Sequence, residues 1–273
     1  MRKFFIYLKV VFMCGPCIIY NFFRYLKYTR HPEKYPFDKR YAMVRKEIMF
    51  VLRRFHIDPK IEGYDILKNA KKPALVISNH YSLMDPVMLI ACSERPITFL
   101  SKKENLKMPI VGQILKILQT FTIDRKNVLS QVRTLQQIGE YLKDESKPHV
   151  VIFIEGTRNK HPEGDTLEFH PGTLKIAYKA NCNIVSSTTY GTFRILKLSS
   201  YLKKYPFFWK IGEPIKPEDY TGKNTIDLAA EMRQKMIEEV NQFRVLDREY
   251  IYDEKISVKR KALETVVDLG VNS

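Results

Sequence analysis

Residues 73–86 read Pro-Ala-Leu-Val-Ile-Ser-Asn-His-Tyr-Ser-Leu-Met-Asp-Pro, and they place a histidine and an aspartate directly after an apolar run. The run is short and rich in strand-forming residues, which predicts a buried strand over residues 74–78. His80 follows it at once, and Asp85 comes five residues later. Five residues on a helix advance by about 500°, so these two side chains would not share a helical face. The stretch therefore predicts a strand that ends in a turn carrying both side chains.

His80 and Asp85 form a candidate catalytic pair if the turn folds back on itself. Asp85-Pro86 resembles a helix start, with Asp85 at the N-cap and Pro86 at the first helical position. A carboxylate bonded to one imidazole nitrogen fixes the tautomer and makes the other nitrogen a better base. The structural alternative is a capping aspartate beside an ordinary loop histidine, and these two residues alone do not decide between them.

Apolar runs and helical periodicities alternate after residue 62. Strands are predicted at 74–78, 97–100, 120–124, 149–154, 183–189 and 207–212. Helices are predicted at 85–92, 109–118, 128–143, 172–180 and 225–244. This alternation favours an α/β sheet covered by helices on both faces, in which ligands gather at the loops that leave the strands.

Two further clusters follow predicted strands. Residues 153–159 read Phe-Ile-Glu-Gly-Thr-Arg-Asn, and residues 122–125 read Thr-Ile-Asp-Arg. Arg158 offers a planar fork of donors suited to phosphate, and Gly156 lets a ligand approach the backbone. Arg125 offers a second phosphate contact. Taken alone, each cluster is also consistent with a charged loop that contains an internal acid–arginine pair.

The chain is strongly basic, with 46 Lys and Arg against 30 Asp and Glu and a formal net charge of +16. Residues 1–60 contain 14 of these basic residues against 4 acidic ones, so this segment contributes +10. The same segment is rich in large apolar residues. That combination suits an anionic membrane surface better than a nucleic-acid groove, so we expect anionic membrane lipids, and no nucleic acid, as partners.

The N-terminal segment is the candidate membrane anchor. Residues 4–23 are apolar except for Lys9 and Asn21. Their length would span a bilayer, but Lys9, a Gly-Pro break and basic residues at both ends favour a re-entrant or interfacial anchor. A membrane span and a soluble core helix are the alternatives. A second, amphipathic helix predicted over residues 38–55 completes a two-helix docking element, although an ordinary surface helix fits its pattern equally well.

These patterns divide the chain into three parts. Residues 1–58 are expected to form the membrane-docking helices, residues 59–245 the α/β domain and residues 246–273 a charged tail. The cysteines are too few for a disulfide framework and predict no metal site. Cys14-Gly-Pro-Cys17 lies in the apolar segment and not after a strand, so a helix break explains it better than a redox centre.

In this order and at these spacings, the clusters resemble the 1-acyl-sn-glycerol-3-phosphate acyltransferase family of glycerolipid acyltransferases. Asn79-His80 followed by Asp85 matches its His-x4-Asp motif, and residues 101–125 match its second block. The run Phe-Ile-Glu-Gly-Thr-Arg at 153–158 matches the third block. The resemblance covers roughly residues 60–218.

Two positions depart from the family pattern. The fourth block usually contains a proline in an apolar run, but residues 184–189 read Ile-Val-Ser-Ser-Thr-Thr. The family's Phe-Lys-x-Gly element is Phe-His-Pro-Gly at 169–172, with His170 in the position of the lysine. The first departure bears on the choice of acyl donor. The second implies that one basic contact is missing or depends on pH.

The resemblance implies a mixed sheet flanked by helices and a direct acyl transfer without an acyl-enzyme. His80 would deprotonate the acceptor hydroxyl and Asp85 would orient His80. Arg158, helped by Arg125, would hold the acceptor phosphate. Glu155 would orient Arg158 or a substrate hydroxyl. The supporting residues are Asn79, Glu155, Gly156 and Thr157.

The resemblance also implies the substrates. The acceptor would be 1-acyl-sn-glycerol-3-phosphate (lysophosphatidic acid), and the product phosphatidic acid. The co-substrate would be acyl-CoA or acyl-carrier protein, with no bound cofactor and no metal, at the cytoplasmic face of the cell membrane. Glycerol 3-phosphate or another lysophospholipid is an alternative acceptor. A non-enzymatic basic membrane adaptor is the alternative of another class.

Overall fold

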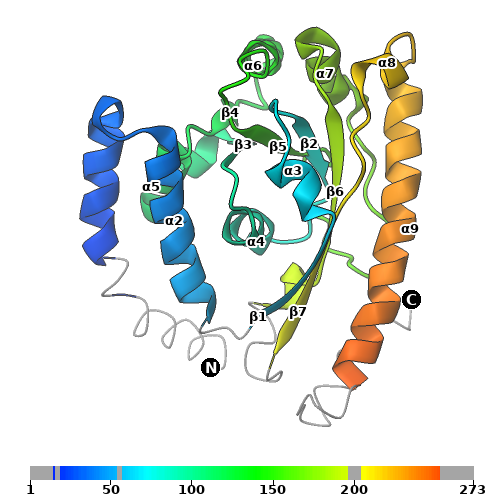
Figure 1. The fold of residues 1–273 in the computed structure, drawn as a ribbon, viewed down its shortest axis with the longest axis horizontal. Coiled ribbons are helices and arrows are strands. Elements are labelled where there is room, and N and C mark those ends of the chain that lie inside the picture. The colour runs from blue at the N-terminus through cyan, green and yellow to red at the C-terminus, as the bar shows by residue number, and fades with distance from the viewer. Residues whose placement is uncertain (1–14, 16–18, 54–56, 196–203, 253–273) are drawn as a thin grey trace.

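A seven-stranded sheet forms the centre of the computed structural model, which describes residues 15, 19–53, 57–195 and 204–252 (Figure 1). The strands are β1 (Ile57–Glu62), β2 (Leu75–Ser78), β3 (Ile97–Lys102), β4 (Phe121–Ile123), β5 (His149–Phe153), β6 (Ile184–Tyr190) and β7 (Tyr205–Ile211). Their order in the sheet is β1-β7-β6-β2-β5-β3-β4. Among these strands the β6–β7 pair is antiparallel and the other pairs are parallel, so the sheet is mixed, as the resemblance implied.

The six predicted strands are confirmed, with ends that shift by at most two residues. Strand β1 was not predicted. Its sequence, Ile-Asp-Pro-Lys-Ile-Glu, has no apolar run, because β1 lies at the edge of the sheet and most of its side chains are exposed. An edge strand with proline and charged side chains is protected against pairing with another chain.

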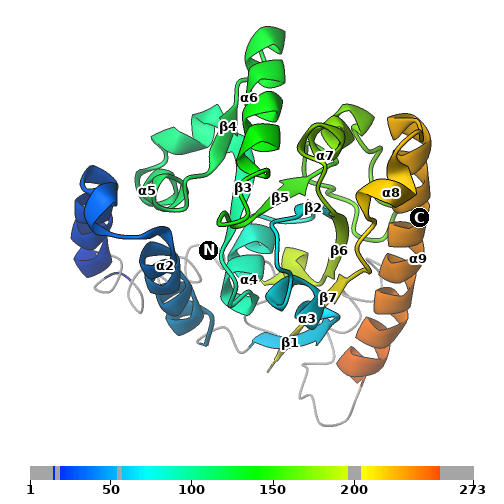
Figure 2. The ribbon, with the colours of Figure 1, turned by 45° about the horizontal axis from the view of Figure 1, so that its top comes forward.

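Helices cover both faces of the sheet (Figure 2). They are α2 (Phe37–Leu52), α3 (Tyr64–Lys68), α4 (Met84–Cys92), α5 (Pro109–Ile117), α6 (Val128–Tyr141), α7 (Lys175–Ala180), α8 (Pro217–Tyr220) and α9 (Thr225–Tyr252). Side chains along β2 alternate between two cores. Val76 packs with α2 and α4, whereas Leu75 and Ile77 pack with α6, α7 and α9. The covered faces explain why β2 and β5 read as nearly continuous apolar runs.

Helix α2 corresponds to the second predicted amphipathic helix, and one of its faces belongs to the core. Tyr41 and Val44 are buried against α4, while Lys46 and Arg53 are exposed. Residues 19–30 form a helix that touches α5. Most of the predicted anchor, residues 4–23, lies outside the described residues. In the part of the chain that is described, no helix is long and apolar enough to cross a membrane.

Helix α9 continues past the expected domain boundary at residue 245. Ile251 is buried, and the Tyr250 hydroxyl donates to Asp58 on the edge strand β1 (Oη–Oδ2 2.6 Å). Residues 246–252 are therefore part of the folded unit and do not belong to a tail. In Figures 1 and 2, α2 and α9 lie on opposite sides of the sheet.

Buried side-chain bonds connect three neighbouring strands. Trp209 on β7, the one tryptophan of the sequence, donates from its indole nitrogen to Ser187 Oγ on β6 at 2.9 Å. Ser78 at the end of β2 donates to the Ser187 carbonyl at 2.8 Å. All three residues are buried, so these polar groups are partnered within the core.

Candidate active site

The turn after β2 is tied to the end of β6 by Asn79. The Asn79 side-chain nitrogen donates to the Thr189 carbonyl, and Asn79 Oδ1 accepts from the Thr189 backbone nitrogen, both at 2.8 Å. Both residues are fully buried. This two-way bond fixes the direction in which the chain leaves the sheet, and so it fixes the position of the next residue, His80.

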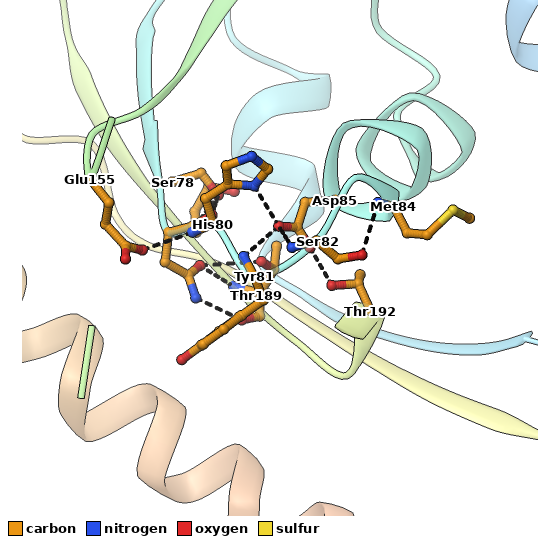
Figure 3. Close-up of polar contacts among 11 residues, drawn as sticks. Ser78, His80, Tyr81, Ser82, Met84, Asp85, Glu155, Thr189 and Thr192 are labelled. Atoms are coloured by element: carbon orange, nitrogen blue, oxygen red, sulfur yellow. Dashed lines mark hydrogen bonds and ion pairs between the residues drawn. The ribbon is translucent and has the colours of Figure 1, made fainter. Parts of the chain in front are cut away.

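The His80–Asp85 pair predicted from the sequence forms at this turn (Figure 3). His80 Nδ1 lies 2.7 Å from Asp85 Oδ2. The same oxygen accepts from the backbone nitrogens of Tyr81 (2.6 Å) and Ser82 (2.8 Å), and the Asp85 side chain is fully buried. These donors hold Asp85 as a buried acceptor, which keeps the proton of a neutral imidazole on Nδ1 and leaves the lone pair on Nε2.

The predicted capping role of Asp85 is wrong. Helix α4 begins at Met84 after Leu83, so Asp85 lies inside the first turn and Pro86 is the third helical residue. The Asp85 carboxylate turns back to the nitrogens of Tyr81 and Ser82, before the helix starts, because the chain folds over it there.

The His80 ring is partly accessible, with 17% of its side chain exposed. One face stacks on the Phe153 ring at the end of β5, with ring centroids 4.2 Å apart and an interplanar angle of 23°. The His80 carbonyl accepts from the Asn159 nitrogen at 2.6 Å. Since β5 is the parallel neighbour of β2, the carboxyl ends of both strands contribute to one site.

Glu155 also contacts this turn, through the backbone. Its Oε1 accepts from the His80 nitrogen (2.8 Å), and its Oε2 accepts from the Leu167 nitrogen (3.0 Å). Burial raises the pKa of the Glu155 carboxyl to about 7. Both oxygens are thus bonded to backbone groups, and in the described part of the chain Glu155 forms no bond with Arg158.

The two candidate phosphate-binding arginines lie at the turn after β5. Arg125 is exposed and donates to the Gly156 carbonyl. Gly156 has a φ of +65°, and a Cβ at this position would lie 2.8 Å from His170 Nε2. Thr157 and Arg158 are exposed, and within the described ranges Arg158 has no hydrogen bond or ion pair. The structure therefore brings Arg125 and His170 to Gly156, two residues before an unpartnered Arg158.

A family model described as Acyltransferase matches residues 58–189. The matched segment includes the His80–Asp85 turn and the turn with Gly156 and Arg158. Over this segment, which is just under half of its length, the chain is similar to the acyltransferase family.

Named relatives of this chain come from organisms as different as Mycoplasma genitalium and Saccharomyces cerevisiae. It is 33% identical over 140 residues to a probable 1-acyl-sn-glycerol-3-phosphate acyltransferase of Mycoplasma genitalium, covering 50% of each chain. It is 28% identical over 188 residues to the 1-acyl-sn-glycerol-3-phosphate acyltransferase of Saccharomyces cerevisiae, covering 67% of this chain and 59% of the relative. These alignments span between half and three fifths of each relative's length.

The crystal structure of the 1-acyl-sn-glycerophosphate (LPA) acyltransferase of Thermotoga maritima has the same fold. It superimposes with a TM-score of 0.67 at 23% identity, covering 88% of this chain and 96% of that one. The α/β architecture inferred from the sequence is thus confirmed.

Sequence reasoning missed two contributors to this site, Phe153 as a stacking partner of His80 and Thr192 as a donor to Asp85 Oδ1. The polar run on β6 was the available signal, because buried serines and threonines need partners. Thr189 bonds Asn79, and Thr188 bonds Glu239 on α9. Among the described residues, no group of three or more His, Cys, Asp or Glu side chains is placed to hold a metal ion.

Proposed function

We propose that the chain transfers a fatty acyl group from an acyl thioester to the free hydroxyl of 1-acyl-sn-glycerol-3-phosphate, giving phosphatidic acid for phospholipid biosynthesis. The names of the relatives from Mycoplasma genitalium and Saccharomyces cerevisiae support this substrate. Acyl-CoA or acyl-carrier protein would be the donor. Both are anionic, which suits a chain with a net charge of +16.

The contact between His80 Nδ1 and Asp85 Oδ2 is the observation that carries the proposal. His80 Nε2 takes the proton of the acceptor hydroxyl as its oxygen attacks the thioester carbonyl. Asp85 stabilises the imidazolium that forms. As the tetrahedral intermediate collapses, the C–S bond breaks and the imidazolium returns the proton to the sulfur, so an ester and a free thiol leave. General acid–base catalysis of this kind contributes roughly 10²–10⁴-fold.

The exposed arginines would hold the acceptor phosphate. Arg158 is exposed and without a partner among the described residues, and Arg125 is anchored at the adjacent Gly156 carbonyl. Two guanidinium groups near one phosphate would align the acceptor hydroxyl with His80. Glu155 and Asn79 would act indirectly, because they bond the backbone around His80. Thr157 would support the same turn.

Residues 1–58 would dock the enzyme on the cytoplasmic face of the cell membrane, as an interfacial or re-entrant element, where anionic lipids and the lysolipid acceptor reside. In the described helix at 19–30, Ile19, Tyr20 and Phe23 are each more than 60% exposed. Arg24, Lys27 and Arg30 follow on the same helix. Exposed apolar side chains beside basic ones are typical of interfacial helices.

Thiol release from palmitoyl-CoA, with and without lysophosphatidate, tests the proposal. We expect acceptor-dependent release by the wild type and a loss of roughly 10²–10⁴-fold in His80→Ala. His161→Ala, which removes an exposed histidine bonded to Glu163, serves as the matched control and should keep the activity. A folded His80→Ala protein with unchanged activity would contradict the role of His80.

The same assay separates the alternatives. Release with glycerol 3-phosphate or another lysophospholipid in place of lysophosphatidate would identify a different acceptor. Release only from acyl-carrier protein would identify the donor. Binding to anionic vesicles without transfer for any pair of substrates would support the membrane adaptor, a role that needs no His80–Asp85 pair.

A further inference from the structure

The second oxygen of the Asp85 carboxylate contacts a side chain from a distant part of the chain. Asp85 Oδ2 bonds His80 Nδ1 and the backbone nitrogens of Tyr81 and Ser82. Asp85 Oδ1 accepts from the hydroxyl of Thr192. Thr192 follows β6 and stands 107 residues from Asp85 in sequence. Figure 3 shows Thr192 and His80 on opposite sides of the carboxylate. Both Asp85 and Thr192 are fully buried, so no solvent competes for these bonds.

The Thr192 bond opposes rotation of the Asp85 carboxylate. Turning the carboxylate about its bond to Cβ would move Oδ2 away from His80 Nδ1 and leave a buried oxygen without a donor. An unpartnered buried charge is strongly unfavourable, so a donor on Oδ1 keeps the carboxylate in the plane that His80 requires. The same carboxylate thus receives a donor on each oxygen.

The short 3₁₀ helix that contains Thr192 (Thr192–Arg194) is itself fixed at both ends. Gly191 has a φ of +101°, and a Cβ there would overlap the carbonyl oxygen of Pro206 on β7. Arg194 is buried and forms a two-pronged ion pair with Asp247 on α9. Its guanidinium also stacks over the Phe193 ring, 4.8 Å from the ring centroid. Thr192 is therefore held against Asp85 by β7 on one side and by α9 on the other.

We propose that Thr192 is a positioning residue for the His80–Asp85 pair, acting through Asp85 Oδ1. This inference rests on the proposed function, in which His80 is the general base. Thr192 acts on the orientation of the base and has no described contact with the region of the phosphate-binding arginines. Its removal should lower kcat and leave the KM for the acceptor nearly unchanged.

The kinetic test compares Thr192→Val with Thr192→Ser. We expect Thr192→Val to lower kcat by about tenfold or more, because the lost bond has a charged acceptor, and Thr192→Ser to stay near the wild type because it keeps the hydroxyl. Thr98→Val is the matched control. Thr98 is also fully buried and donates to a carbonyl, that of Leu118 (2.8 Å), on a strand that does not carry His80. If Thr192→Val does not fold, Thr192→Ala can replace it, because it also lacks the hydroxyl that Thr192→Ser keeps.

A second measurement does not depend on activity. ¹⁵N NMR of histidine-labelled protein, with His80 assigned from the His80→Ala spectrum, reports the tautomer of the ring. We expect the Nδ1-protonated form in the wild type and in Thr192→Ser, and a mixture of both tautomers in Thr192→Val. An unchanged tautomer together with a kcat loss no greater than in Thr98→Val would overturn the positioning role. A tautomer change in a protein that transfers no acyl group would uphold the positioning role and reject the proposed function.

Discussion

Two turns leave neighbouring strands of the sheet, and they differ in how much of their chemistry is fixed by the protein. In the turn after β2, Asp85 is fully buried, and both of its carboxylate oxygens accept hydrogen bonds: Oδ2 from His80 and two backbone nitrogens, and Oδ1 from Thr192. In the turn after β5, Thr157 and Arg158 are exposed, and Arg158 has no bonding partner among the described residues. The first turn is organised before any substrate arrives, whereas the second offers charge at an open surface.

The difference follows from what each turn would do in the proposed reaction. A general base must meet its proton at a fixed distance and angle, and a rigid network supplies that geometry. A phosphate-binding side chain does not need a geometry fixed in advance, because an exposed arginine can move to the position of the phosphate and bond it there. Substitutions in the two turns should therefore change different kinetic constants.

The largest effect is expected from Asp85→Asn, which breaks the first turn. A carboxamide cannot accept every donor that surrounds Asp85, and it cannot stabilise the His80 imidazolium. We expect kcat to fall by roughly 10²–10⁴-fold in thiol-release assays on folded protein. Asp65→Asn, in the first turn of α3 and exposed, is the control that should leave kcat unchanged. Equal rates in both variants would remove the distinction between the two turns.

The next effect should come from Arg158→Ala, in the open turn. Loss of a charged contact to phosphate is expected to raise the KM for lysophosphatidate about 10- to 100-fold, with little change in kcat or thermal stability. Lys160→Ala, which removes an exposed charge two residues away, is the control. A lower kcat with an unchanged KM would mean that Arg158 supports catalysis by His80 and does not bind the acceptor phosphate.

Gly156→Ala tests whether the turn after β5 depends on its backbone conformation. Gly156 has a positive φ, and an added Cβ would lie 2.8 Å from His170 Nε2. We expect a loss of about 1–2 kcal/mol in unfolding free energy and a raised acceptor KM, measured by urea unfolding and by kinetics. Gly164→Ala, where the nearest atom would be 3.6 Å away, should have a smaller effect. If Gly156→Ala loses no more unfolding free energy than Gly164→Ala, the positive φ and the close approach to His170 are not needed for stability.

The smallest effect concerns Glu155, which links the two turns. Its folded-state pKa of about 7 lies above the ordinary value of 4.5, because burial disfavours the carboxylate. The folded protein therefore keeps a proton that the unfolded chain releases. Stability from this group is fully present below pH 4.5 and is lost as the pH rises through 7.

Glu155→Gln cannot titrate and provides the reference for this effect. Between about pH 6 and pH 7, the wild type should lose about 1 kcal/mol of unfolding free energy relative to the variant. Urea unfolding of both proteins at the two pH values measures the difference. A difference that stays constant with pH would contradict the raised pKa.

The sequence predicted the interior of this fold better than its edges. Strands β2 and β5 at the centre were found because strands covered on both faces are nearly continuous apolar runs. Strand β1 was missed because its pairing with β7 is made by the backbone of exposed residues, which leaves no side-chain pattern. The end of α9 was missed because Val245 and Leu246 are exposed there, and single buried residues such as Ile251 do not form a visible stripe.

At the candidate site, the sequence indicated residues that are close along the chain. His80 and Asp85 were paired correctly because one turn holds both. Thr192 was not found, since it reaches Asp85 from more than one hundred residues away and depends on how β6 and α4 pack. The expectation that Glu155 orients Arg158 or a substrate hydroxyl remains a prediction. In the described residues its oxygens bond the nitrogens of His80 and Leu167, a role that no local pattern encodes.

The indole of Trp209 gives this chain a built-in optical probe. It is the one tryptophan in the sequence, it is buried, and its nitrogen donates to Ser187 across the antiparallel pair β6–β7. Ser187 in turn accepts from Ser78, the last residue of the strand that leads to His80. Fluorescence emission from Trp209 therefore reports the state of the strands behind the candidate site. Without any added label, it can follow whether a substitution in either turn loosens the sheet or leaves it intact.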